Sequence, residues 1–172
     1  MKEKFNNMLE SIKTDLIFLA NEVENAIYKS IKSLEMQDKE MAKDVRKADR
    51  EINYREIDIE KYILSLMALQ QPVAMDLRFM IVALKMNNDL ERMGDHAKSI
   101  AKSVNRLAQE PYIKPIEDIL QLGKLTRNMM HDSVQSFIYL NTELAEEVRQ
   151  RDKECDELYK KIYFSVQDKD NQ

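Results

Sequence analysis

The sequence has no tryptophan and contains only one cysteine, two glycines and three prolines in 172 residues. A single cysteine excludes an intramolecular disulfide framework and fits a reducing compartment, so we expect a cytoplasmic protein. So few turn-forming residues over this length favour a few long helices with short connections over a sheet protein. The predicted fold class is therefore all-α.

Further absences narrow the function. The longest apolar run, residues 79–84, is too short to span a bilayer, and the charged N-terminus has no apolar signal-peptide core. A net charge of -4 without a basic stripe argues against nucleic acid as a partner and against a polybasic membrane anchor. No phosphate-binding glycine loop, nucleophile elbow or Glu-x-x-His pair is present, so we expect no enzyme, and a di-iron oxidase least of all.

Apolar residues recur at steps of three and four and predict amphipathic helices. Asp38 is placed to cap the second helix, Asn141 or Thr142 the fifth, and Pro72 ends the second helix. The prolines of residues 109–115 indicate a linker, and "QDKDNQ" (residues 167–172) a polar tail. The predicted helices span about 3–34, 39–69, 73–107, 115–140 and 143–167.

An internal repeat joins the two halves of the chain. "EMAKDVRKADREIN", from Glu40, aligns with "ELAEEVRQRDKECD", from Glu143, at an offset of 103 residues. The repeat predicts tandem three-helix bundles, a first in residues 1–108 and a second, lacking its third helix, in residues 109–172. The missing third helix is consistent with a truncated chain, with a naturally short chain and with a bundle completed by another chain. We expect a homodimer that covers the apolar stripes of the incomplete bundle; the alternative is that its helices pack on the first bundle.

One stretch of the third helix, "NNDLERMGDHAKSI" (residues 87–100), combines a glycine with an acidic pair. Glu91 and Asp95 lie one turn apart, with Asn88 one turn earlier, on a face that leaves the main apolar stripe. Stacked carboxylate and amide oxygens are ligands for a hard cation. Gly94, at the flank of the stripe, would let a neighbouring helix or a ligand approach.

The second helix offers a matching pair, Asp49 and Asn53, which antiparallel packing could bring beside Glu91 and Asp95. The repeat places Asp152 and Asp156 at the corresponding spacing on the fifth helix. Acidic residues on a charged helix are more often merely solvated, so a helical interaction module without metal and a carboxylate-bridged metalloenzyme both stay open as alternatives.

"ALQQPVAMDLR" (residues 68–78) followed by "NNDLERMGDHAKSIA" (residues 87–101) resembles the PhoU family, and the resemblance extends over the whole chain. It implies two tandem three-helix bundles and a cytoplasmic, non-enzymatic negative regulator of phosphate uptake and of phosphate-starvation signalling. The implied partners are the ATPase subunit of the phosphate ABC transporter and a membrane sensor histidine kinase. An accessory protein of another phosphate permease is the closest alternative.

The resemblance also implies a multinuclear iron or zinc cluster bound through E(D)-x-x-x-D motifs. Glu91 and Asp95 match that motif on the third helix, and Asp49 matches the acidic position on the second. Two departures weaken the match. Asn53 is a poorer ligand than aspartate, and the second bundle, which offers Asp152 and Asp156, lacks the helix that would supply its other ligands.

Overall fold

The structure, a computed structural model, describes residues 2–107, 112 and 116–167, and this part of the chain contains five helices and no strand. The all-α prediction is confirmed. Most of the predicted linker, like the polar tail, lies outside the described residues. Within the described residues no helix has both the length and the apolar character needed to cross a bilayer. The helices are α1 Lys2–Met36, α2 Lys39–Gln70, α3 Ala74–Leu107, α4 Glu117–Ile138 and α5 Thr142–Gln167.

Local chemistry sets the helix ends as the sequence predicts. The Asp38 carboxylate accepts hydrogen bonds from the backbone N–H groups of Glu40 and Met41, both at 3.0 Å, and so caps α2. α2 ends where Gln71 adopts a left-handed conformation (φ 46°) directly before Pro72. The Asn141 side chain accepts from the Leu144 N–H at 3.0 Å at the start of α5.

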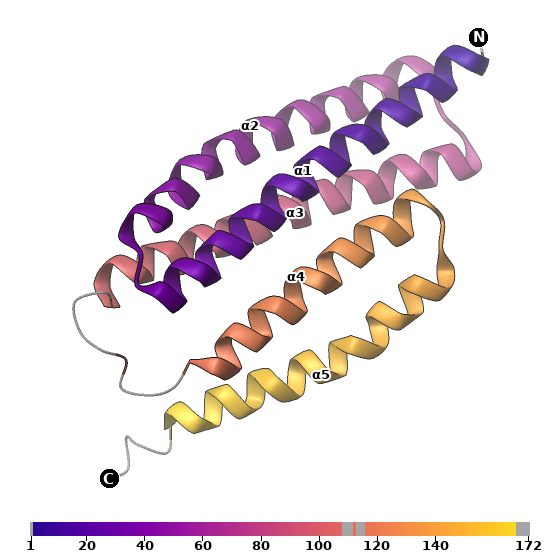
Figure 1. Cartoon of the computed structure of the whole chain (residues 1–172). Helices are drawn as coiled ribbons and strands as arrows, with labels where there is room; N and C mark the ends of the chain where they lie inside the picture. The colour runs from indigo at the N-terminus through magenta and orange to yellow at the C-terminus, as the bar shows by residue number, and fades with distance from the viewer. Residues whose placement is uncertain (1, 108–111, 113–115, 168–172) are drawn as a thin grey trace.

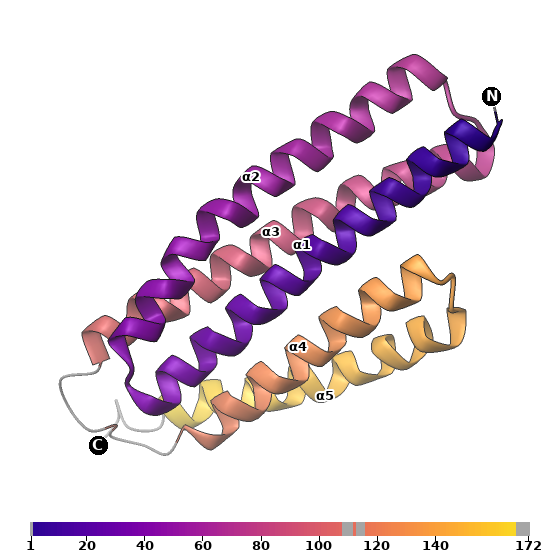
Figure 2. The ribbon, with the colours of Figure 1, turned by 45° about the horizontal axis from the view of Figure 1, so that its top comes forward.

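Helices α1, α2 and α3 form one three-helix bundle, and α4 and α5 form a hairpin that lies across α1 from α2 (Figures 1 and 2). On α2, apolar residues seven positions apart in the sequence, Val45, Ile52, Ile59 and Leu66, are all buried. The apolar spacing of α3 predicts a buried stripe at Met86, Leu90, Met93, Ala97, Ile100, Val104 and Leu107. Leu90, Ala97 and Val104 are buried as predicted, but Leu107 is exposed and the other three are only half-buried. The buried face includes Asn87 and Gly94 instead. Gly94 is therefore buried against α2, not at a flank.

Helix α4 packs against the first bundle of its own chain. Phe137 stacks on Phe79 of α3 with ring centroids 5.0 Å apart, and Met130, Val134 and Ile138 are buried. The expectation that both helices of the second repeat expose their apolar stripes is therefore wrong for α4, because α1 covers it.

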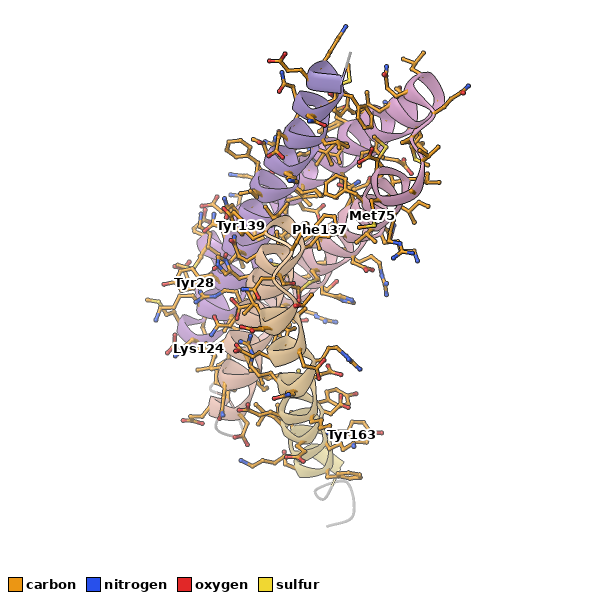
Figure 3. The ribbon with its side chains drawn as sticks, turned by 90° about the vertical axis from the view of Figure 1, so that its right-hand side faces the viewer. Tyr28, Met75, Lys124, Phe137, Tyr139 and Tyr163 are labelled. Atoms are coloured by element: carbon orange, nitrogen blue, oxygen red, sulfur yellow. The ribbon has the colours of Figure 1, made fainter. Side chains whose placement is uncertain are left out.

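Helix α5 contacts α4 and leaves an aromatic group in solvent. Tyr159, Tyr163 and Phe164 are all exposed; the Tyr159 and Tyr163 rings stack, and the Tyr163 and Phe164 rings meet edge to face. Figure 3 places Tyr163 at the far end of the hairpin from Phe137 and Tyr139. We call these three residues the α5 aromatic cluster.

Candidate functional site

Polar side chains interrupt the buried face between α2 and α3, and the most buried charged one is Asp49. Only 4% of Asp49 is exposed, within the apolar series of α2. Its Oδ2 atom accepts a hydrogen bond from the Lys98 ammonium at 2.6 Å, whereas its Oδ1 atom, also buried, has no hydrogen-bond partner. A buried carboxylate destabilises a fold unless it is paired with a positive charge, and Lys98 provides that positive charge.

Lys98 also reaches the acidic pair on its own helix. Its ammonium lies 3.4 Å from Asp95 Oδ1, so one cation bridges α2 and α3 through two carboxylates. The hydrogen bond to Asp49 raises the pKa of Lys98 above its ordinary value, and its partial burial opposes that shift. Lys98 is therefore held in its charged form.

Glu91 shares this cluster of charges. Burial raises the pKa of its carboxyl above the ordinary value, and the negative charges of Asp95 and Asp49 raise it further, while Lys98 lowers it. Glu91 is thus repelled by the carboxylates of both Asp95, on its own helix, and Asp49, on α2. The structure thus brings together acidic residues from both helices, as the spacing of the sequence suggests.

Amide groups extend the polar strip along the same interface. Asn53, one turn after Asp49, has a buried Oδ1 atom without a hydrogen-bond partner. Asn87, which is 1% exposed, donates from Nδ2 to the backbone oxygen of Glu56 at 2.9 Å and to its carboxylate at 3.1 Å, and its own Oδ1 is unpaired. Burial and repulsion by Glu60 and Glu91 raise the pKa of Glu56.

We call this set of side chains the polar seam. It comprises Asp49, Asn53 and Glu56 of α2 with Asn87, Glu91, Asp95 and Lys98 of α3. Three of its buried oxygen atoms, from Asp49, Asn53 and Asn87, lack a hydrogen-bond partner in the described part of the chain. Unpaired buried oxygens are uncommon in folded proteins and call for a specific explanation such as a bound ion or water.

The donor set of the polar seam fits a hard cation in its chemistry but not in its present spacing. Carboxylate and amide oxygens suit such an ion. Among the residues that the structure describes, however, no three His, Cys, Asp or Glu side chains are spaced to hold a metal ion. Lys98 already provides a positive charge to Asp49 and Asp95, so a metal at these residues requires the ammonium to move.

The remaining predicted site residues lie apart from the buried oxygens. Asn88 is exposed on α3, and its neighbour Asn87 takes the buried position instead. Asp152 and Asp156 are both exposed on α5, a helix that packs against α4. These two acids are therefore solvated in this arrangement.

Sequence reasoning missed Lys98, Glu56 and Asn87, although two of them leave a signal. Lys98 follows Glu91 by seven residues and Asp95 by three, so all three share a face of α3. Asn87 continues the steps of three and four that lead through Leu90 to Gly94. The buried face of α3 was predicted from apolar residues alone, so the polar Asn87 was not included in it.

Comparison with known proteins places this arrangement in a family. The PhoU domain profile matches residues 16–104 and 119–170, so it covers parts of both repeats. The chain is 41% identical to the phosphate-specific transport system accessory protein PhoU homolog of Aquifex aeolicus over 154 residues, which is 90% of this chain and 70% of that protein. It is 30% identical to PhoU of Escherichia coli over 159 residues, which is 92% of this chain and 66% of that one.

Solved structures agree with the sequence comparison. The crystal structure of PhoU from Pseudomonas aeruginosa superimposes with a TM-score of 0.90 at 29% identity, covering 94% of this chain and 78% of that one. PhoU from Streptococcus pneumoniae gives 0.83 at 33% identity, covering 90% and 73%. Sequence and fold together show that the chain belongs to the PhoU family.

Proposed function

We propose that this chain acts without catalysis as an adaptor in phosphate transport, on the cytoplasmic side of the membrane. In this role it holds the ATPase subunit of the phosphate ABC transporter and a membrane sensor histidine kinase in an uptake-repressing state. Membership of the PhoU family, whose relatives are named as accessory proteins of phosphate-specific transport, is the observation that supports the proposal. Fold alone would not support it, because function belongs to sites and not to folds.

Co-purification tests the adaptor role. The tagged full chain should retain the phosphate-transporter ATPase subunit and the cytoplasmic part of the kinase from the same organism. The ATPase subunit of an unrelated ABC importer, present at the same concentration, serves as the control. Retention of neither phosphate-system protein, or equal retention of both ATPases, would contradict the proposal.

The adaptor further carries a metal, with iron or zinc as the first candidates, on the polar seam. Asp49, Asn53, Glu91 and Asp95 would hold the ion, and the unpaired Oδ1 atoms of Asp49 and Asn53 support this assignment. A bound cation would cancel the repulsion among the carboxylates and change the charge that this face presents to a partner. Lys98 would have to leave Asp49 and Asp95 for the ion to bind.

Elemental analysis tests the metal assignment. Protein purified without chelator should contain iron or zinc, and the Glu91→Ala/Asp95→Ala variant should lose it because two of its oxygen ligands are gone. Asp76→Ala/Asp89→Ala removes two other carboxylates from α3 and should leave the metal content unchanged. Equal metal content in all three proteins would show that Glu91 and Asp95 do not bind the metal.

Self-association through the α5 aromatic cluster completes the proposal. Three neighbouring exposed aromatic side chains form an apolar surface of the kind that protein contacts bury. The expected assembly is a homodimer in which two such clusters meet.

A further inference from the structure

A groove with a strongly basic lining lies between the start of α2 and the end of α3. These two segments run side by side at the same end of the bundle (Figures 1 and 2). The groove has a volume of about 1150 Å³, and seven basic against three acidic side chains line it. The whole protein has a net charge of -4, so positive charge is concentrated here.

Some of these cations are already paired and others are not. Lys43 lies 3.6 Å from Glu40, and Lys98 is held by Asp49. Lys39, Arg46, Arg50 and Lys102, which are all exposed, form no ion pair with any residue that the structure describes. These four side chains, which we call the open cations, can bind an external anion without breaking an internal contact.

The basic side chains repeat at a regular spacing. Arg46 and Arg50 are four residues apart on α2, and Lys98 and Lys102 are four residues apart on α3. Four residues of helix correspond to about 6 Å. Carboxylates at every fourth position of an acidic helix recur over the same distance, so such a helix laid along the groove would meet one cation per turn.

The same geometry disfavours a compact anion and a bilayer. Lys39 and Arg50 are separated by about 16 Å along α2, so few of the cations can reach one small anion together. The groove also exceeds the usual volume of a small-ligand pocket, which is about 300–1000 Å³. Its concave surface does not match a flat membrane.

We propose that the basic groove is a docking surface for an acidic helical segment of a partner protein. The docking chemistry follows from the groove itself, and only the assignment of that segment to a phosphate-transport protein rests on the proposed function. Charge complementarity of this kind increases the association rate and selects the partner, and added salt weakens it.

Fluorescence anisotropy with the full chain tests the groove directly. The probe is a labelled alanine-based peptide with glutamate at every fourth position, compared with a peptide of the same composition and helicity whose glutamates are scrambled. Arg46→Ala/Arg50→Ala/Lys102→Ala removes three open cations and should weaken binding of the regular peptide about tenfold or more at low salt. Lys124→Ala/Lys153→Ala/Lys160→Ala, which removes three exposed lysines from α4 and α5, should change it less than about twofold.

Several outcomes would overturn the inference. Equal loss in the two variants would mean that net charge, and not the groove, attracts the peptide. Equal affinity for the scrambled peptide would exclude helical spacing as the basis of recognition. Tighter groove-dependent binding of polyphosphate, or of vesicles with equal parts phosphatidylglycerol and phosphatidylcholine, would assign the groove to another ligand.

The co-purification described above separates this inference from the proposed function. If the chain retains no phosphate-transport protein but binds the regular peptide through the groove, the adaptor proposal fails and the docking surface stands. If the chain retains its partners and the groove variant binds the peptide as well as the wild type does, the docking inference fails alone.

Discussion

Lys98 is the residue on which the polar seam depends. It neutralises a carboxylate, Asp49, that is almost completely buried and that has one oxygen atom without any other partner. A charge left alone in such a position destabilises a fold more than the intact pair stabilises it. Removing the ammonium should therefore destabilise the fold by leaving the Asp49 carboxylate buried and unpaired. It should also increase the affinity of that carboxylate for another cation.

The Lys98→Met variant tests this role. In the presence of a chelator its free energy of unfolding should fall by about 2–3 kcal/mol, somewhat less than for a fully buried pair because Lys98 is partly exposed. Urea denaturation at neutral pH measures the change. Lys102→Met, one turn further along α3, should change the value by less than about 0.5 kcal/mol, and an equal loss there would refute a specific role for Lys98.

Glu56 makes the stability of the protein depend on pH. Because its pKa is raised in the folded state, the protonated carboxyl favours folding. That stabilisation is complete below the unfolded pKa and is lost as the pH rises through the folded pKa. Glutamine at this position keeps an oxygen that can accept from Asn87 and never ionises.

The Glu56→Gln variant should therefore gain stability relative to the wild type between about pH 4 and about pH 7. Unfolding free energies from urea titrations across this range give the difference. A difference that stays constant with pH would show that Glu56 does not titrate within it.

At the scale of helices, two glycines allow close contacts that a methyl group would disturb to different degrees. A Cβ atom on Gly94 of α3 would lie 3.2 Å from Ile52 of α2, a contact that a small side-chain adjustment can relieve. A Cβ atom on Gly123 of α4 would lie 2.7 Å from two atoms of Ile31 of α1, so something must move. Gly123 thus sets how closely the hairpin approaches the bundle.

Gly123→Ala should destabilise the protein by about 1–2 kcal/mol, because overpacking outweighs the gain of about 1 kcal/mol from alanine in a helix. In an Ile31→Ala background Gly123→Ala should cost less, since the clashing side chain is already gone. A double-mutant cycle of unfolding free energies measures the coupling. Purely additive effects of the two substitutions would contradict the contact.

In the whole molecule, the two helices of the hairpin have different surroundings: α4 packs against the first bundle, and one face of α5 is exposed to solvent. The apolar face of α4 is covered by α1, whereas the α5 aromatic cluster remains exposed. The basic groove lies between α2 and α3, so the molecule offers an apolar surface for self-association and a charged surface for a partner.

Light scattering at micromolar concentration tests the proposed dimer. The wild type should have the mass of two chains, and Tyr159→Ser/Tyr163→Ser should have the mass of one because it removes most of the apolar contact. Tyr54→Ser/Tyr139→Ser removes two other exposed tyrosines and should remain dimeric. A monomeric wild type would contradict the proposed dimer. Dissociation of both variants would show that the α5 aromatic cluster is not specifically the dimer contact.

The helices can be predicted from local signals in the amino-acid sequence. Periodic apolar residues, the Asp38 cap and Pro72 act within a few positions of one another, so they define the α2 ends without reference to the rest of the fold. The seven-residue series on α2 likewise identified buried positions. The proximity of Asp49 to the acids of α3 could also be predicted, because two neighbouring antiparallel helices can pack in only a few registers.

Which side chains contact one another between those helices depends on how the helices pack. That Lys98 pairs with Asp49, that Asn87 and Gly94 lie inside, and that α4 packs on α1 all depend on side chains distant in the sequence. A helical pattern gives the direction of each side chain but not the neighbour that it finds there. The polar seam and the basic groove are therefore products of packing, each assembled from two helices whose separate sequences show only scattered charges.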